Sequence, residues 1–497
     1  MQKQPQCNEK SANNYFMYLE DSEYPEHAPY DPEIKYPEYC FEFNSDNRMK
    51  RNDIYRMIRE IFIADNMDYE NINTDKWNPL GTYISPGSTV LIKPNLVMSS
   101  NNAEKDVQKQ MDCLITHPSI VRCLFDYVCI ALKGKGKVIV ADAPVQDCDF
   151  DKLLERSGYG ELFCYLKKRE TPDFMVDIAD LRDTILCSDN GNLIQCRNKN
   201  NKYGSIVVDL KEASCFQEIK NKKRLRVTNY AAKDTVEHHS RGKNEYCISE
   251  VVLDADVIIN IPKPKTHRIA GYTAALKNMI GINVKKEFLP HHRQGMKKNG
   301  GDEYADGHKI LKYMNTQGND VKNWALKNRY IFIMNMANEF SRRIGRILDH
   351  KEQNRKKFGM WYGNDTIWRT ILDVNHIVYY FGKDRMMHKE KQRTVLHFGD
   401  MIVCGDKEGP LHPGYKKVGG ILFSDNPVEF DFCVVKLMGF DYKKFPVLAN
   451  ALNDKKLSGH NPGNIILNSN REEFNKKVSS ISTNFEFEPS KGWNDYL

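Results

Sequence analysis

Basic side chains suited to acid–base and anion-binding chemistry are concentrated in residues 254–292, DADVIINIPKPKTHRIAGYTAALKNMIGINVKKEFLPHH. They follow an apolar run that is typical of a buried strand. The basic residues of interest are Lys263, Lys265, His267, Lys277 and His292. Ammonium groups bind anions, and imidazoles exchange protons near neutral pH. The combination predicts a site for an anionic ligand in which His267, Lys277 and His292 are the candidate catalytic groups.

The segment between His267 and Lys277, RIAGYTAAL, is rich in small residues, which let a ligand approach the backbone closely. If a helix begins near Tyr272, its free N–H groups attract an anion. A buried Lys277 would have a lowered pKa and serve as a base or covalent anchor, whereas an exposed Lys277 would be an ordinary helix lysine. We assign His267 the role of acid or base. The candidate anion- and substrate-binding residues are Lys93, Asn95, Lys263, Lys265 and Asn278.

Three apolar segments must position these side chains, and each ends in polar residues. They are residues 87–97 with Lys93 and Asn95, residues 136–144 with Asp142, and residues 251–262, followed by Lys263. Helical patterns in residues 116–134 and 149–159 alternate with them. This alternation is typical of a parallel sheet with crossover helices, whose ligands bind at the carboxyl ends of the strands. We therefore expect Lys93, His267 and Lys277 to share one pocket.

The patterns along the chain predict an α/β protein, with a largely parallel sheet flanked by helices, an antiparallel insertion or lid and a polar N-terminal arm. The predicted parts are the arm at 1–50, a first α/β half at 51–170, the insertion or lid at 171–250, the site strand, helix and a mobile basic loop at 251–325, a second α/β half at 326–455, and a polar tail at 456–497. Residues 325–348 have the pattern of a long amphipathic helix. Residues 418–440 have that of a strand, a turn and a helix capped by Asp425 or Asn426.

An acidic segment forms a second candidate site, GDMIVCGDKEGPLHPGYKKVGG, residues 399–420. Carboxylates are preferred ligands of divalent cations and also act in acid–base catalysis. Asp400, Asp406 and Glu408, with His412 nearby, are therefore candidate metal ligands in a loop. The alternative is that this segment is an acidic surface loop.

The composition and the missing motifs argue against several classes of protein. The 497 residues carry a net charge of +7 from 73 basic and 66 acidic side chains, which is too evenly mixed to predict a nucleic-acid partner. The thirteen cysteines include no CxxC pair, which argues against an iron–sulfur cluster and favours reduced thiols in the cytoplasm. No apolar run is long enough to predict a membrane span. Motifs of P-loop NTPases, dinucleotide-binding enzymes, zincins and α/β-hydrolases are missing.

Five segments in order along the chain resemble a large family, domain-of-unknown-function family 362. They are VLIKPNLV, THPSIV, KVIVADAP, DADVIINIPKPKTH with GYTAALKNMIG, and GPLHPGYKKVGGILFSDNPVEFDFCVVKLMGFD, which together cover most of residues 87–445. Many members carry a ferredoxin-like cysteine cluster. This chain lacks it, so an iron–sulfur role is not expected.

The stretch ADVIINIPKPKTHRIAGYTAALKNMIG also resembles the cofactor segment of nickel-pincer lactate racemases. In that segment a strand leads to a histidine, an Ala-Gly-aromatic-small run and a lysine that holds the pincer. The resemblance implies these roles for His267 and Lys277, and that of a later histidine for His291 or His292. An earlier catalytic histidine is expected after KVIVADAP, where this chain has VQDCDF, so two-base racemisation is not implied.

Three functional hypotheses follow. The first is an enzyme acting on an anionic hydroxy acid, sugar or phosphorylated metabolite by acid–base chemistry like that of a racemase or epimerase. The second is a transferase that uses a divalent metal in the acidic 400–412 loop. The third is a non-catalytic anion-binding or scaffold protein. Metal content and ligand-induced thermal stabilisation would separate them, because a ligand that binds only the folded state raises the melting temperature.

Overall fold

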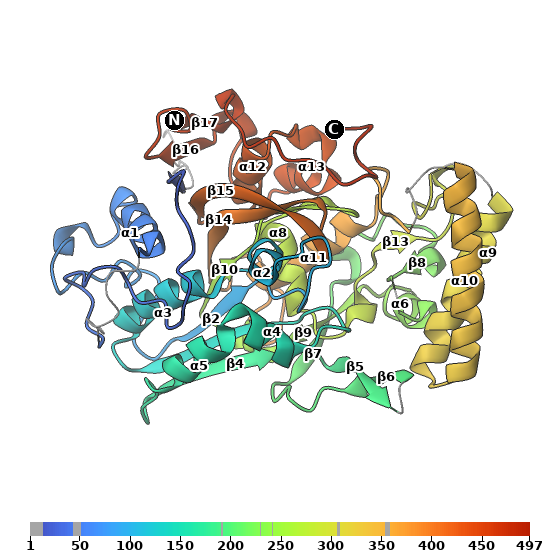
Figure 1. The fold of residues 1–497 in the computed structure, drawn as a ribbon, viewed down its shortest axis with the longest axis horizontal. Coiled ribbons are helices and arrows are strands. Elements are labelled where there is room, and N and C mark those ends of the chain that lie inside the picture. Colours follow the sequence, from blue (N-terminus) through green and yellow to red (C-terminus); the bar gives the residue numbers. More distant parts are fainter. Residues whose placement is uncertain are drawn as a thin grey trace, which may run out of the picture.

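The structure is a computed structural model that describes residues 13–42, 51–189, 192–228, 230–240, 242–305, 309–352 and 358–497. A large twisted sheet runs through the body, with helices on both faces and a helical hairpin at one end (Figure 1). The fold is therefore α/β, as the alternation of strand and helix patterns predicts.

The sheet has the strand order β17-β16-β1-β15-β14-β10-β2-β3-β4, with β11 and β12 attached to β14. Its strands are β1 (Asn14–Tyr18), β2 (Thr89–Pro94), β3 (Gly136–Asp142), β4 (Phe174–Asp180), β10 (Val257–Ile261), β11 (Lys265–His267), β12 (Gly271–Thr273), β14 (Thr394–Glu408), β15 (His412–Ser424), β16 (Ile466–Ser469) and β17 (Lys476–Lys477). β14, β10, β2, β3 and β4 pair in parallel, so the carboxyl ends of β10, β2 and β3 meet at one edge. The three strands predicted to belong to one sheet do so.

Both faces of the parallel strands are buried, because alternate residues enter two separate cores. Leu91, Ile139 and Ile258 face the first core, and Val90, Val138 and Val257 face the second. The helices are α1 (Asp53–Ala64), α2 (Val107–Leu114), α3 (Pro118–Leu132), α4 (Phe150–Ser157), α5 (Tyr159–Lys167), α6 (Ala232–His238), α7 (Glu250–Asp254), α8 (Ala275–Asn278), α9 (Lys309–Lys327), α10 (Ile331–Glu352), α11 (Ile367–Tyr380), α12 (Pro427–Leu437) and α13 (Pro446–Asn453). α1, α3 and α5 cover the second core, and α11, α12 and α13 the first.

Both ends of the described chain join the main sheet. β1 pairs with β15 and β16, although it lies in the segment predicted as a polar arm. The apolar and aromatic side chains of NYFMY explain this, because Phe16 and Met17 are buried. The predicted polar tail likewise supplies β16, β17 and the buried Trp493. Residues 1–12 and 43–50 of the predicted arm lie outside the described residues.

The middle of the chain departs from several predicted boundaries. β4 lies in the main sheet rather than in the insertion, which then supplies the antiparallel pairs β5 (Thr184–Asp189) with β6 (Asn192–Arg197) and β7 (Ser205–Asp209) with β9 (Glu245–Ser249). β8 (Leu225–Arg226) pairs with β13 (His292–Arg293). The predicted strand at 251–262 begins as α7, whose apolar residues are buried beside the sheet. Most of the predicted basic loop is helix α9, and the long helix predicted from residue 325 begins at Ile331 as α10.

The helix at α3 and the strand–turn–helix unit at β15 and α12 match their predictions. Pro118 occupies the first turn of α3, and Asn426 caps α12 by accepting hydrogen bonds from the N–H groups of Val428 and Glu429. In the described residues no single helix is long and apolar enough to cross a bilayer, although α2 and α3 together, bent by 50°, meet that test by length and composition.

Candidate functional site

A cavity of about 490 Å³ opens at the carboxyl edge of the parallel strands. Residues just after β2, at the end of β3 and between β11 and α8 form one side of it, and α9 with the segment around Tyr230 forms the other. The side chains that the sequence predicted for the site and that line this cavity are Asn95, Lys265, His267, Lys277 and Asn278. The position agrees with the general location of ligand sites in open parallel sheets.

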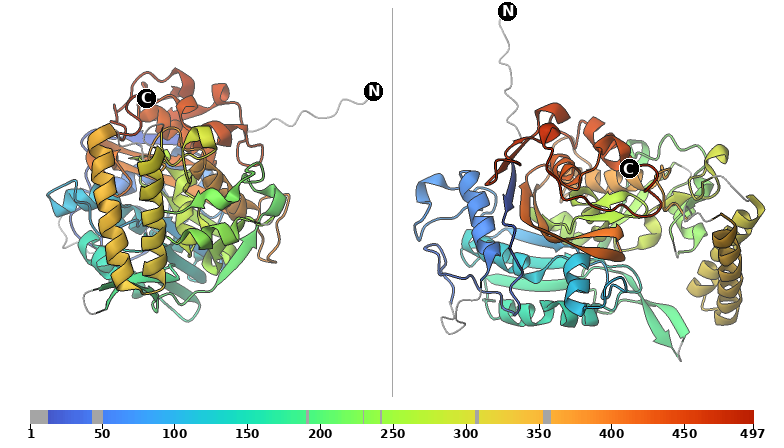
Figure 2. Two further views of the ribbon diagram at one scale, coloured as in Figure 1. Left: turned by 90° about the vertical axis from the view of Figure 1, so that its right-hand side faces the viewer. Right: turned by 45° about the horizontal axis from the view of Figure 1, so that its top comes forward.

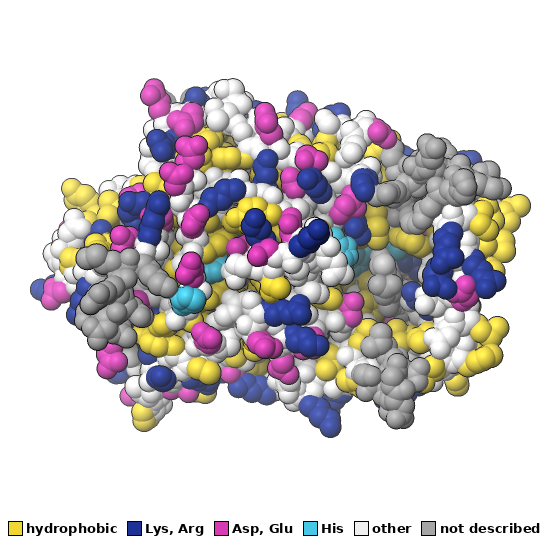
Figure 3. All heavy atoms as spheres, in the orientation of Figure 1, with side chains coloured by type: hydrophobic (Ala, Val, Ile, Leu, Met, Phe, Trp, Pro, Cys, Tyr) yellow, Lys and Arg dark blue, Asp and Glu magenta, His cyan; other side chains and the backbone are white. Residues whose placement is uncertain are grey.

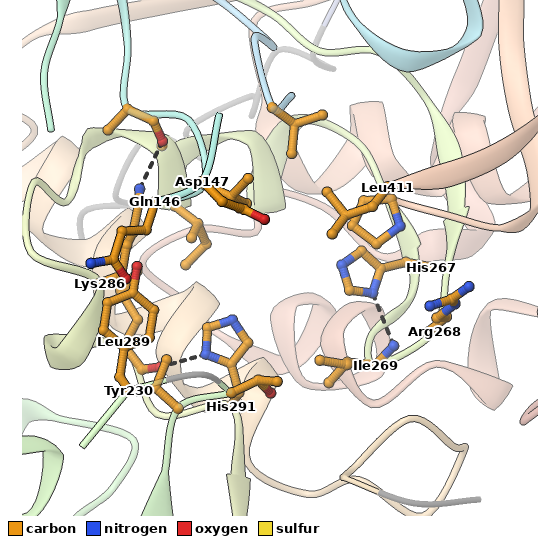
Figure 4. A pocket seen from close by; sticks show the side chains of 18 of the residues that line it. Gln146, Asp147, Tyr230, His267, Arg268, Ile269, Lys286, Leu289, His291 and Leu411 are labelled. Atoms are coloured by element: carbon orange, nitrogen blue, oxygen red, sulfur yellow. Dashed lines mark hydrogen bonds between the residues drawn. The ribbon is translucent and has the colours of Figure 1, made fainter. Parts of the chain in front are cut away.

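His267 projects into the cavity from the end of β11 (Figure 4). Its Nδ1 accepts hydrogen bonds from the backbone N–H groups of Ile269 at 2.9 Å and Ala270 at 3.1 Å. A backbone N–H can only donate, so Nδ1 is unprotonated and the proton of the neutral ring is on Nε2. Burial, followed by the nearby Lys277, holds the pKa of His267 well below its usual value. His267 is therefore a neutral ring that donates from Nε2.

The tight turn after His267 depends on Gly271, where β12 begins. Its φ is +84°, and a Cβ there would lie 2.4 Å from the Phe445 ring. Both facts exclude a side chain, since a positive φ strains other residues and the ring leaves no space. The glycine thus fixes the turn that brings the N–H groups of Ile269 and Ala270 to the His267 ring.

His291 lies on the opposite side of the cavity from His267 (Figure 4). Its Nδ1 is 2.6 Å from the Leu289 carbonyl oxygen, which can only accept, so Nδ1 carries the proton. The Nε2 of the neutral ring is then a hydrogen-bond acceptor. Burial, with a smaller contribution from Lys277, lowers the pKa of His291 to about 4. The two histidines thus hold opposite tautomers, one a donor and the other an acceptor.

Four lysines, Lys265, Lys277, Lys286 and Lys322, line the cavity, and burial lowers the pKa of each. The pKa values are about 7 for Lys265, about 8 for Lys277 and about 7 for Lys286. Lys265 Nζ donates to Asn95 Oδ1 at 2.9 Å, and Lys286 Nζ donates to the Ala143 carbonyl at 2.7 Å. Within the described residues, Lys277 Nζ has neither a hydrogen bond nor an ion pair, which leaves it available to a ligand.

Lys93 does not line the cavity but supports its wall. Its Nζ lies 2.8 Å from Asp142 Oδ1, and both side chains are buried. Asp142 also accepts hydrogen bonds from the N–H groups of Leu96 and Ala143. Gly281 is required here, because a Cβ at that position would lie 2.0 Å from Asp142 Oδ1. The expectation that Lys93 would share the pocket with His267 and Lys277 is therefore wrong for the Lys93 side chain.

Asn95 and Asn278 connect this support to the cavity. Asn95 Nδ2 donates to Asn278 Oδ1 at 3.0 Å, and Asn278 Nδ2 donates to Asn260 Oδ1 at 2.7 Å. Both amides line the cavity, so they are fixed in place where they face a ligand. Fixed orientation of polar groups is what a binding site for a specific small molecule requires.

Lys263 is buried away from the cavity, in an ion pair with Asp400. Its Nζ lies 2.6 Å from Asp400 Oδ2 and donates to the Tyr24 hydroxyl at 2.8 Å. Asp400 also accepts hydrogen bonds from the Tyr24 hydroxyl and from the His117 N–H. Lys263 and Lys265 are two residues apart, but their side chains end in different environments. The assignment of Lys263 to the ligand site is not supported.

The predicted acidic loop is mostly strand β14, and its carboxylates do not converge. Asp400 pairs with Lys263, and Glu408 pairs with Arg268 at 2.9 Å. The turn after β14 contributes only Pro410 and Leu411 to the cavity. Among the described residues, the one cluster with metal-ligand spacing is Cys215, Asp373 and His376, elsewhere in the fold. Asp400, Asp406 and Glu408 thus do not form a common metal site.

Two further predictions differ from the structure. His292 faces a separate cavity of about 70 Å³, and its neighbour His291 faces the larger one. The predicted helix near Tyr272 is reduced to α8, four residues long, and the Leu276 N–H donates to Asp431. α8 is therefore not an anion-binding helix terminus, and the lysine side chains provide the positive charge at the cavity instead.

Lys286 and helix α9 also line the cavity, although neither was among the predicted site residues. In the sequence, Lys286 lies between Lys277 and the adjacent His291 and His292, and this position among basic residues could have indicated that it belongs to the site. α9 contributes Lys322, Asn323 and Leu326 to the cavity wall. Nothing local in the sequence links these residues to β11 or β2, because the contact is made by tertiary packing.

The structure is that of an α/β protein with a lysine-lined cavity at the carboxyl edge of its parallel strands. Residues 90–174 and 187–436 match the family described as Domain of unknown function (DUF362), and the chain belongs to that family. No curated protein matches the chain.

Proposed function

We propose that the protein is an enzyme that acts on a small anionic metabolite, such as a hydroxy acid, a sugar acid or a phosphorylated compound. The observation that carries the proposal is the pair of fixed, opposite tautomers of His267 and His291 on two sides of one cavity. A hydrogen-bond donor and a proton acceptor across a substrate are the requirement for acid–base catalysis. The cationic lysines supply attraction for the anionic group.

In this proposal, the carboxylate or phosphate of the substrate binds Lys277, whose amine has no other partner within the described residues. His267 Nε2–H donates a hydrogen bond to an oxygen of the reacting centre. His291 Nε2 accepts the proton that leaves the substrate. The proposal differs from the sequence-based expectation at one residue, since His291 takes the place of His292, and it specifies the donor role for His267, which was expected to be an acid or a base.

Lys277 supports a second role that the resemblance to nickel-pincer racemases implies. A buried amine with a lowered pKa has a larger neutral fraction near pH 7 and is a suitable point for covalent attachment of a cofactor. The metal-dependent transferase is the weaker alternative, because Asp400 and Glu408 are engaged in ion pairs. The other alternative is a non-catalytic anion-binding protein, and the experiment must distinguish it from an enzyme.

Solvent hydrogen exchange tests the proposal directly. Purified protein is incubated in D₂O with candidate hydroxy acids and sugar phosphates, and loss of carbon-bound protons is followed by NMR. We expect the protein to catalyse exchange in at least one compound that also raises its melting temperature. His291→Gln should retain binding and lose exchange. Compounds that stabilise the protein without exchange would show an anion-binding protein instead.

The affinity for the anionic ligand is expected to fall as the pH rises from 6 to 9. The lowered pKa values of about 7 for Lys265 and Lys286 and about 8 for Lys277 place their deprotonation in this interval. Below these values the amines are cationic and attract the anion, and above them they are neutral. Isothermal titration at fixed ionic strength measures the effect. Lysines with ordinary pKa values would give an affinity that is constant up to about pH 9.

A further inference from the structure

The hairpin of α9 and α10 projects from the body, with its two helices side by side (Figure 2). More than half of the large hydrophobic side chains that are exposed in the described part of the chain lie on it. They are Ile310, Tyr313, Val321, Trp324, Tyr330, Phe332, Ile333, Met336, Phe340 and Ile347. Phe332 is 76% exposed and Ile310 75%. Isolated exposed hydrophobic residues are normal, but a contiguous group marks an interaction surface.

The exposed residues form one stripe on each helix. At 100° per residue, Phe332, Ile333, Met336, Phe340 and Ile347 fall within an arc of about 100° on α10. Ile310, Tyr313, Val321 and Trp324 fall within about 80° on α9. The buried Ala337 and Ile344 lie outside the α10 stripe. The stripes are therefore surfaces that remain uncovered after the hairpin has packed.

The hairpin also carries much of the excess positive charge of the protein. Residues 309–352 contain nine Lys or Arg and four Asp or Glu, a net charge of +5 against +7 for the whole chain. Of these basic residues, Lys312 is buried and Lys322 lines the cavity, and the others whose side chains the structure describes can face outward. Asp320 is paired with Arg226, which lies outside the hairpin, and Glu339 is paired with Arg342 and Arg343 on α10. In Figure 3 basic and hydrophobic side chains gather together along the edge where the hairpin lies.

We propose that the outer surface of the α9–α10 hairpin docks onto an anionic lipid membrane. Amphipathic helices with aromatic and aliphatic residues beside basic ones bind at the boundary between headgroups and acyl chains. A nucleic acid would use the basic residues but not aliphatic side chains such as Ile310, Val321 and Ile347. A second copy of the chain would bring two strongly positive surfaces together. The combination of charge and apolar area thus favours anionic lipid over both.

Docking would place the candidate site close to the membrane. The side of α9 that faces the cavity carries Lys322, Asn323 and Leu326, opposite to its exposed stripe. One helix thus forms both a wall of the cavity and part of the docking surface. The docking proposal is independent of the reaction, because it depends only on the outer face of the hairpin.

Vesicle flotation with the full chain tests the docking proposal. Vesicles of phosphatidylcholine mixed with phosphatidylserine should carry the protein upward, and vesicles of phosphatidylcholine alone should carry much less. Met336→Ser should weaken binding about tenfold, because serine does not gain the favourable free energy that a methionine side chain gains when it enters the apolar layer of the bilayer. Met386→Ser is the matched control, since Met336 and Met386 are both 59% exposed, and it should bind like the wild type.

Charge and self-association are tested in the same assay. Arg329→Gln with Arg346→Gln should weaken binding about fivefold for each charge removed, whereas Lys135→Gln with Lys168→Gln, exposed residues elsewhere, should not. Binding that is equal for both kinds of vesicle, or unaffected by Met336→Ser, would overturn the proposal. It would also be overturned if light scattering showed a dimer that Met336→Ser dissociates, because a second copy would then be the occupant.

Discussion

Lys277→Ala is expected to abolish ligand-induced stabilisation of the protein while the apo protein still folds. The Lys277 amine lines the cavity and has neither a hydrogen bond nor an ion pair among the described residues, so under the proposed function it binds the anionic group of the ligand. A charge-assisted hydrogen bond contributes roughly 1.5–3 kcal/mol, which corresponds to a loss of affinity of about 10- to 150-fold. Covalent attachment would be lost outright. Differential scanning fluorimetry with and without the ligand measures both stability and binding.

The same substitution should leave the melting temperature of the apo protein within a few degrees of the wild-type value. When the amine is removed, no other group among the described residues loses a hydrogen bond. The unfavourable free energy of burying an ammonium group is also removed. Lys298→Ala, which changes an exposed lysine outside the cavity, should alter neither binding nor stability strongly. If Lys277→Ala binds normally, Lys265 and Lys286 become the leading anion-binding groups. If it unfolds the protein, Lys277 has a structural role.

The sheet could be predicted from the sequence because its central strands carry apolar side chains at several consecutive positions. Segments such as VLI and VIIN can be buried only if both faces of the strand are covered, which requires a parallel sheet between two layers of helices. The polar residues that follow these strands, such as Asn95 and Asp142, line the cavity at the carboxyl edge of the sheet. Periodicity could not reveal β1, because five residues in a polar segment give too short a pattern.

The choice among neighbouring basic residues could not be made from the sequence. His291 and His292 are adjacent, and residues that follow one another in an extended segment face opposite sides, so only one of them reaches the large cavity. Lys263 and Lys265 are both at the strand end, yet only Lys263 finds a buried carboxylate. That carboxylate, Asp400, is far away in the sequence. Tertiary pairing thus decides which lysine lies in a buried ion pair and which lines the cavity.

Asp400→Ala is expected to lower the stability of the protein by about 3–5 kcal/mol, the usual effect of removing one partner from a buried ion pair. Asp400 and Lys263 are fully buried, and the lysine would keep an uncompensated ammonium group next to Tyr24 and the Val403 carbonyl. For a chain of this length the melting temperature should fall by about 3–5 °C. Thermal unfolding followed by circular dichroism measures the change.

Glu408→Ala provides the matched control, because Glu408 lies on the same strand but its ion pair with Arg268 is partly exposed. Such pairs contribute about 0–1 kcal/mol, so the melting temperature should change little. The double variant Asp400→Asn with Lys263→Met removes both charges and should recover much of the lost stability, because no buried charge is left without its partner. If instead Asp400→Ala and Glu408→Ala were equally destabilising, and only without a chelator, the strand would hold a metal ion. An effect confined to Asp400 and independent of chelator shows that this carboxylate ties β14 to the end of β10, to α3 and to the N-terminal segment.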